Sequence, residues 1–303
     1  MSERMAEISA HIDSVRQLGS VVNAIKGIAA ARARNARAEV QAVDRYSAVI
    51  VEAVVSAFGH DIATCTHDTR KQEPASDDAS TGWLLFLAEQ GFAGAFSERL
   101  LDSLGTALGS APLMVVGTRG LSILAAREIT PLWSAPMPSH SPGIPALADT
   151  LTTVIHDQLS KGHFERLELV YTRWEGGAPQ RVHRRLLPLE LESFAPGSPQ
   201  DARISTPHTA ARPRERPLLQ LPPAQLLEQL YQDVVHAQLC QAALHAFAAE
   251  NEARMQAMAS AASQIERELA DYKTTLQQVR QETITAEIIE LGKGASSTER
   301  KTR

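Results

Sequence analysis

The sequence has little cysteine, few aromatic residues and no long apolar run. Its two cysteines, Cys65 and Cys240, lie far apart, which excludes a disulfide framework or a paired-thiol metal site and predicts two inert thiols. Aromatic residues make up 5% of the chain, and together with plentiful Ala, Gln and Glu this favours long helices over a β-sandwich. No apolar run approaches the roughly 20 residues that a membrane-spanning helix needs. We therefore expect a soluble protein that is able to dock on a membrane complex.

The chain also lacks a strong overall charge. Its formal net charge of −5 gives no general attraction to nucleic acid or anionic lipid, so an electrostatic partner must be sought locally. One basic stretch stands out, because no acid interrupts it and it lies in a helical segment: Lys26, Arg32, Arg34 and Arg37. No aromatic residue interleaves these side chains, so we do not predict nucleic-acid binding. Two interpretations remain, an attraction to an acidic protein surface and an ordinary solvated helix face.

Proline is absent from the first segment, residues 1–58. Its apolar residues recur at steps of three and four, which predicts one long helix: Ile8, Ile12, Val15, Val22, Ile25 and Ala29. At 1.5 Å per residue such a helix is roughly 80 Å long. Residues 60–82 are polar and predict a linker or surface loop.

The middle of the chain, residues 82–190, alternates buried-strand and helix patterns. Strands are expected at Trp83–Ala88 and Leu113–Val116, and helices at Phe96–Leu108 and Ile144–Lys161. Two further strands, Arg166–Trp174 and Arg181–Leu189, flank a Gly-Gly-Ala-Pro turn. This order predicts a Rossmann-like α/β domain. Residues 191–222 are rich in proline and predict a surface loop.

After Pro223 there is again no proline, and Pro222-Pro223 suits a helix start. A heptad seam follows over more than four heptads: Met255, Met258, Ala262, Ile265, Leu269, Tyr272, Leu276, Val279, Thr283 and Ala286. We expect a C-terminal helix over 223–292, with Gly292 and Gly294 as stops. The N-terminal helix is the one other segment of matching length. The fold prediction is therefore α/β, with a long antiparallel coiled coil of the terminal helices projecting from the central domain.

This architecture and several local strings resemble the gamma subunit of F-type ATP synthases over nearly the whole chain. The most specific string, Arg280 to Glu290 followed by Gly294-Ala295, meets the family signature at Ile284, Thr285, Glu287, Glu290, Gly294 and Ala295. The family's N-terminal pattern is met at Glu7-Ile8, Ile12, Ser14-Val15 and Ala24-Ile25-Lys26 through Ala29-Ala30. In the middle, Glu89-Gln90-Gly91-Phe92-Ala93-Gly94-Ala95-Phe96 resembles the turn after the family's first strand.

The chain departs from the family pattern at two of these places. Gln17 to Val22 replace the usual Asn-Thr and Lys-Ile-Thr, and Phe92-Ala93-Gly94 replace Leu-Cys-Gly. The loop before Pro223 also looks longer than usual. These differences suggest a divergent branch, such as an alternative ATPase beside a standard one, and they leave the coupling ion open between proton and sodium.

The resemblance implies a non-catalytic rotary shaft that couples ion flow to ATP synthesis or hydrolysis. The coiled coil would sit, as a single copy, inside a hexamer of alpha and beta subunits, and the α/β foot would contact the epsilon subunit and the membrane c-ring. The protein would then be peripheral, on the cytoplasmic face of the bacterial inner membrane.

The family also implies which residues face the catalytic subunits. They are Ile25, Lys26, Arg32 and Arg34 in the first helix, and Arg280, Gln281, Thr285 and Glu287 in the last. Arg280 and Gln281 match positions that form a catch with a catalytic-subunit loop, and Arg suits directional hydrogen bonds there. Ordinary surface polarity and local helix propensity are the alternatives at these positions. For Glu287 and Glu290, near a helix C-terminus where the macrodipole disfavours acids, an external cation or an interhelical hydrogen bond is expected.

No catalytic residue, cofactor or metal site is predicted. The Gly91-x-x-Gly94 turn lacks the Gly-Lys-Ser/Thr of a phosphate loop, and His60, Cys65 and His67 fall in a polar segment without a second ligand pair. Two other classes remain: a structural coiled-coil adaptor that self-associates through the seam, and a small α/β enzyme with helical arms.

Overall fold

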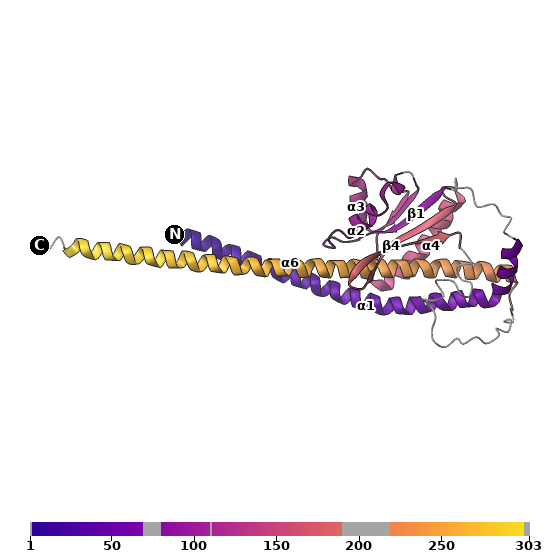
Figure 1. The fold of residues 1–303 in the computed structure, drawn as a ribbon, viewed down its shortest axis with the longest axis horizontal. Helices are drawn as coiled ribbons and strands as arrows, with labels where there is room; N and C mark the ends of the chain where they lie inside the picture. The colour runs from indigo at the N-terminus through magenta and orange to yellow at the C-terminus, as the bar shows by residue number, and fades with distance from the viewer. Residues whose placement is uncertain (1, 69–79, 110, 190–218, 300–303) are drawn as a thin grey trace. The chain divides into compact units, whose positions relative to one another are not determined.

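The computed structural model describes residues 2–68, 80–109, 111–189 and 219–299. Residues 69–79 of the predicted loop at 60–82, and residues 191–218 of the predicted loop at 191–222, therefore lie outside the described residues. The chain divides into two compact units. The helix-pair unit holds residues 1–29 and 255–303, and the sheet unit holds residues 30–254. Figure 1 labels the main elements. In chain order the elements are α1 Ser2–Asp68, β1 Thr81–Phe86, α2 Phe96–Asp102, η2 Gly105–Leu108, β2 Leu113–Val116, α3 Thr118–Ala126, β3 Trp133–Ala135, η3 Ser141–Gly143, α4 Ile144–Ser160, β4 Arg166–Glu175, β5 Ala178–Leu187 and α6 Pro223–Glu299.

The sheet unit is built on one sheet in the order β3-β2-β1-β4-β5. The neighbours β3, β2, β1 and β4 run parallel, while β5 is antiparallel to β4 across the turn at Gly176-Gly177. Parallel strands covered on both faces carry uninterrupted apolar runs, which is why WLLF and LMVV were readable as strands. The predicted central α/β domain is therefore confirmed.

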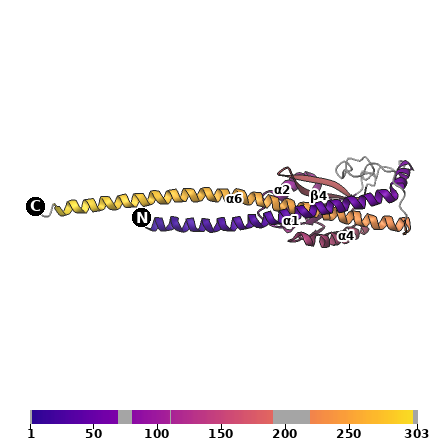
Figure 2. The same ribbon diagram turned by 90° about the horizontal axis from the view of Figure 1, so that it is seen from below.

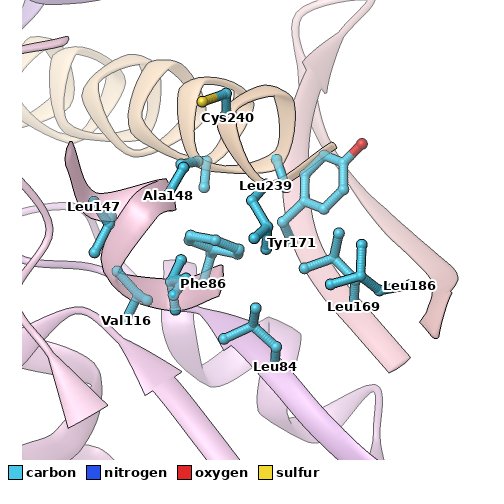
Figure 3. Packing of buried hydrophobic residues seen from close by; sticks show 14 of the residues in the cluster. Leu84, Phe86, Val116, Leu147, Ala148, Leu169, Tyr171, Leu186, Leu239 and Cys240 are labelled. Atoms are coloured by element: carbon cyan, nitrogen blue, oxygen red, sulfur yellow. The ribbon is translucent and has the colours of Figure 1, made fainter. Parts of the chain in front are cut away.

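Each face of this sheet has its own core. Leu84 and Phe86 of β1 point to the face covered by α4 and α6, where they pack with Leu147, Ala148 and Leu239 among others (Figure 3). The alternate residues Leu85 and Leu87 point to the other face, which α2 and α3 cover through Leu100, Leu101 and Leu124. Helix α6 is thus part of the sheet unit's core as well as of the helix pair.

The sheet unit also contains an antiparallel contact between α1 and α6. Ile50 and Val54 of α1 pack with Val234 and Ala237 of α6. Nearby, Gln241 Nε2 donates to Asp44 Oδ1 at 2.6 Å.

In the helix-pair unit the heptad seam is confirmed by burial. Val15 and Val22 of α1 pack with Met258, Ala262 and Ile265 of α6, and the two helices run side by side in Figure 2. The pairing is antiparallel, because the rings of His11 and Tyr272 meet at a tilt with centroids 4.5 Å apart, while Gly19 faces Ile265. A Cβ on Gly19 would lie 3.2 Å from Ile265 Cγ2, so glycine allows the two helices to approach closely at this point. The last predicted seam position, Ala286, is exposed and so was wrongly assigned to the seam.

Both long helices run further than predicted. α1 continues to Asp68 instead of ending at residue 58, since residues 60–68 contain neither proline nor glycine, so the expected linker there was wrong. α6 continues to Glu299, through Gly292 and Gly294, instead of ending at 292. A glycine inside a helix weakens it by about 1 kcal/mol but does not by itself end it. Helix α3 and strand β3 were not predicted. Among the described helices, none has the length and apolar character that crossing a bilayer demands.

Candidate functional site

The predicted contact residues of the first helix differ in exposure. In the helix-pair unit Ile25 is half-buried beside the seam and Lys26 is half-buried. In the sheet unit Arg34 is exposed, whereas Arg32 is half-buried and its Nη1 donates to Gln90 Oε1 across a long 3.4 Å. The structure therefore leaves Arg34 more accessible to a partner than the other three.

Arg37, the last residue of the basic stretch, has a side chain that is 55% exposed. Its guanidinium forms an ion pair with Glu252 of α6, whose side chain is 5% exposed. Arg37 therefore has an ion-pair partner within the chain, while more than half of its side chain lies in solvent.

The predicted residues near the C-terminus form an exposed helical segment. Arg280, Gln281, Thr285 and Glu287 are all exposed, and Thr285 Oγ1 donates to the Gln281 carbonyl at 2.8 Å. Three isoleucines are at least half exposed on the same segment: Ile284, Ile288 and Ile289. Glu290, Gly294 and Ala295 continue the helical backbone, and their side chains lie outside those the structure describes. Exposed isoleucines in a group mark a surface suited to a protein partner.

A buried polar cluster, which the sequence analysis missed, lies where α6 meets the turn after β1. We call Glu89, Glu250, Asn251 and Arg254 the Glu250 cluster. Glu250 Oε2 and Oε1 accept the backbone N–H groups of Glu89 and Gln90 at 3.0 and 3.1 Å. Arg254 pairs with Glu250, donates from Nη1 to Asn251 Oδ1 at 2.9 Å, and donates from Nε to the Gly91 carbonyl at 3.0 Å. Helix α6 is thus bonded to both N–H and C=O groups of one turn.

Glu89 extends the cluster to the ends of the neighbouring strands. Its carboxylate accepts Thr118 N at 2.9 Å, Thr118 Oγ1 at 2.8 Å and Met137 N at 2.8 Å. Thr118 begins α3 directly after β2, and Met137 follows β3, so these groups meet at the carboxyl edge of the parallel strands. In α/β folds this edge and the helix N-terminus are common phosphate sites. Here the protein's own carboxylate takes the Thr118 N–H.

The turn itself is the one resembling the family's middle string. Phe92 lies at its tip with φ of 64° and is 68% exposed, while Gly94 also adopts a positive φ of 59°. Ala93 and Phe96 pack inward with Ala249 of α6. The turn therefore presents one aromatic side chain outward on a backbone that the Glu250 cluster holds.

Little in the sequence marked Glu250 and Arg254 as special. A Glu and an Arg four residues apart on a helix usually form an exposed pair. The sequence offers one sign of their burial, which is the neighbouring residues. The polar run Glu250-Asn251-Glu252 directly follows a stretch rich in Ala, Leu and Phe, a composition typical of a buried helix.

The predicted absence of a metal site rested on the wrong local structure. His60, Cys65 and His67 belong to α1 and not to a polar loop, and their side chains lie outside those described. In the part of the chain that is described, no three His, Cys, Asp or Glu side chains are grouped to hold a metal ion.

Cys240 is buried on α6, and its thiol should react slowly. Burial, followed by the negative charge of Asp149, raises the pKa of Cys240 to about 11. In a Cys65→Ser variant at pH 8, we expect a thiol reagent to label Cys240 about a hundredfold more slowly in the folded protein than in urea, because the thiolate is scarcer by about two pKa units. Equal labelling rates in the two conditions would contradict an inert thiol.

Comparison with known proteins places these features in a family. A family model described as ATP synthase matches residues 4–298. The ATP synthase gamma chain of Ruminiclostridium cellulolyticum is 23% identical over 99% of this chain and 100% of its own length. That of Beutenbergia cavernae is 28% identical over 94% of this chain and 95% of its own.

Solved structures agree in fold. A chain of the Euglena gracilis mitochondrial ATP synthase, in a structure of its OSCP, F1 and c-ring, superposes with a TM-score of 0.63 at 13% identity, covering 100% of this chain and 97% of that one. A chain from the rotor of the same enzyme gives a TM-score of 0.61 at 14% identity, over 94% of this chain and 100% of that one.

Proposed function

Because this chain belongs to the ATP synthase family, we propose that it is the gamma subunit, the central rotary shaft of an F-type ATP synthase, and that it has no catalytic site of its own. The observation that carries the proposal is coverage: the family match runs from residue 4 to residue 298, through both long helices and the sheet between them. A match to the sheet alone would have fitted a small α/β enzyme equally well.

A shaft needs torsional stiffness and an asymmetric surface. The buried seam between α1 and α6 gives stiffness in the helix-pair unit. The C-terminal end of α6, drawn in yellow in Figure 2, continues beyond the start of α1 and is not paired with α1 there. Any bound partner shifts a conformational equilibrium only by its difference in affinity for the conformations. A shaft that contacts three otherwise equivalent catalytic sites differently would therefore favour a different conformation at each. Rotation would present such contacts to each site in turn.

The contact residues are proposed by position and supported by exposure. Arg280, Gln281, Thr285 and Glu287 would meet a catalytic-subunit loop, and the exposed isoleucines beside them would lie in the collar around the shaft. Ile25, Lys26, Arg32 and Arg34 would face an acidic part of the catalytic subunits, with Arg34 the most accessible of the four.

The wider assembly follows from the same proposal. One copy would stand in a hexamer of alpha and beta subunits, and the sheet unit would bind the epsilon subunit and the membrane c-ring. The protein would be peripheral, on the cytoplasmic face of a bacterial inner membrane, and would couple either protons or sodium ions. Native purification tests this: we expect one copy with three alpha and three beta subunits by native mass spectrometry. Homodimers through the seam without those subunits would support the adaptor instead.

Removing the exposed end of α6 should weaken coupling. Truncation after Arg280 deletes the proposed contacts Gln281, Thr285 and Glu287. We expect the ions translocated per ATP hydrolysed to fall about fivefold or more, the range of ordinary coupling energies. The assay is ATP-driven ion uptake with vesicles carrying the assembled enzyme, normalised to hydrolysis. Truncation after Glu299 is the matched control, because it leaves all of α6 in place. Full coupling in the variant truncated after Arg280 would contradict the proposed contacts.

A further inference from the structure

One turn of α6 buries four polar side chains in the core of the sheet unit. Glu250, Asn251, Glu252 and Arg254 are 3%, 2%, 4% and 5% exposed. Charged groups are costly to bury unless they are paired and hydrogen-bonded. We therefore look for a function of these four polar side chains that apolar side chains at the same positions would not perform.

These side chains connect α6 to several elements through directional bonds. Glu250 and Arg254 hold the backbone of residues 89–91, and Glu89 passes the connection to the start of α3 and the end of β3. Helix α1 joins at the same end of the sheet, because Glu252 pairs with Arg37 and Ser141 Oγ donates to Glu39 Oε1 at 2.6 Å. Both long helices are thereby bonded to the carboxyl edge of the parallel strands.

The other contacts between α6 and the sheet are mainly apolar. The exception is Arg184 of β5, which donates to Gln241 Oε1 at 3.0 Å and to the Gln238 carbonyl at 3.1 Å. Leu239, Ala243 and Phe247 pack on the sheet face below the helix. Apolar burial is non-directional, so a small rotation or sliding of the helix loses little of it. A carboxylate that accepts two backbone N–H groups at 3.0 and 3.1 Å has little such freedom. Displacing α6 against the turn would break both hydrogen bonds and leave two N–H groups and the carboxylate oxygens without these partners.

We propose that the Glu250 cluster is a joint that transmits torque between the long helices and the sheet of the sheet unit. Glu250 and Arg254 are its positioning residues, because their hydrogen bonds prevent α6 from slipping against the turn after β1. This inference rests on the proposed function, since a joint of this kind matters only in a protein that transmits rotation. It adds a site within the shaft to the contacts that the shaft makes with its partners.

Two conservative variants test the joint in the assembled enzyme. Glu250→Gln keeps the shape of the side chain but removes the charge that pairs with Arg254 and one of the acceptors for the backbone N–H groups. Arg254→Lys keeps the charge but loses the fork that reaches Gly91 and Asn251 together. The control is Asp157→Asn. Asp157 of α4 and Lys161, which directly follows α4, form an ion pair with the same four-residue spacing, and both side chains are about half exposed.

We expect ATP hydrolysis to stay close to that of the unaltered enzyme in all three variants. Ions translocated per ATP should fall about fivefold or more in Glu250→Gln and by a smaller factor in Arg254→Lys, and should not change in Asp157→Asn. Hydrogen exchange should also rise at the amides of Glu89 and Gln90 in the first two variants. A purely structural role would raise the exchange without changing the ratio of ions to ATP.

Full coupling in both cluster variants together with faster exchange at residues 89 and 90 would overturn the joint. An equal loss of coupling in Asp157→Asn would overturn it as well, because the effect would not belong to the cluster. The proposed function is tested separately by the unaltered chain: if that chain does not assemble with ATPase subunits, the shaft itself is wrong, whatever the variants do.

Discussion

Replacing Ile265 with aspartate should destabilise the helix-pair unit by about 3–5 kcal/mol. Ile265 is 7% exposed and packs in the seam with Val15 and Val22. Removing a buried isoleucine costs roughly 2–5 kcal/mol, and placing an unpaired carboxylate in the space adds to that loss. The close approach at Gly19 leaves little room for water to solvate the new charge.

The chain offers a matched control and two separable signals. Ile284→Asp makes the same exchange on the same helix at a side chain that is 50% exposed, so we expect a change within about 0.5 kcal/mol in the free protein. All three tryptophans, Trp83, Trp133 and Trp174, lie in strands of the sheet unit. Their fluorescence therefore follows the sheet, while far-ultraviolet circular dichroism follows the helices.

For Ile265→Asp we expect the helical signal to decrease at lower urea while the tryptophan transition remains nearly in place. Equal effects of Ile265→Asp and Ile284→Asp on the helical signal would show that the seam does not hold the pair together. In the assembled enzyme the ranking can change, because Ile284 belongs to the proposed contact surface.

The sequence predicted the elements whose burial pattern is local. β1 and β2 carry apolar residues without a break because helices cover both faces of a parallel sheet, and the seam repeats because two helices pack along their length. Such periodicities can be read from the sequence without knowing which distant residues pack against each element. The fold class and the order of the major elements could therefore be predicted from residues alone.

What remained hidden depends on contacts between distant segments. Strand β3 has three residues and only half-buried or exposed side chains, so it carries no strand pattern of its own. The burial of Glu250 becomes visible only once residues 89 and 90, far away in the sequence, supply its donors. The glycines near the C-terminus misled for a different reason, because a glycine allows a helix to end without requiring it. The roles of Arg280, Gln281, Thr285 and Glu287 stay predictions.

His245 is a buried imidazole at the centre of the sheet unit. Its ring stacks on Tyr171 with centroids 5.9 Å apart, and its Nε2 lies 3.8 Å from Asp44 Oδ1 of α1. Burial is the main reason that the pKa of His245 falls to about 4, with Arg173 and Arg184 lowering it further and Asp44 and Glu175 opposing the fall. The folded protein therefore holds a neutral imidazole.

This depressed pKa should make the sheet unit less stable as the pH falls. Between the unfolded pKa of about 6.5 and the folded pKa of about 4, the unfolded chain binds a proton that the folded chain does not, so stability is present above pH 6.5 and is lost towards pH 4. The slope reaches at most about 1.4 kcal/mol per pH unit, and between pH 8 and pH 5 the loss should be about 2 kcal/mol. His245→Gln should lose this part of the pH dependence.

Urea unfolding followed by tryptophan fluorescence at pH 8 and pH 5 measures the difference, and comparing each protein with itself removes any fixed cost of the substitution. Asp44→Asn provides a test of sign, because removing the carboxylate that favours the imidazolium should lower the pKa of His245 further and extend the sensitive range to more acidic pH. Identical pH slopes for the unaltered protein and His245→Gln would mean that the imidazole is protonated as readily in the folded protein as in the unfolded chain. In that case the contact with Asp44, and not the burial beside Tyr171, would determine its charge.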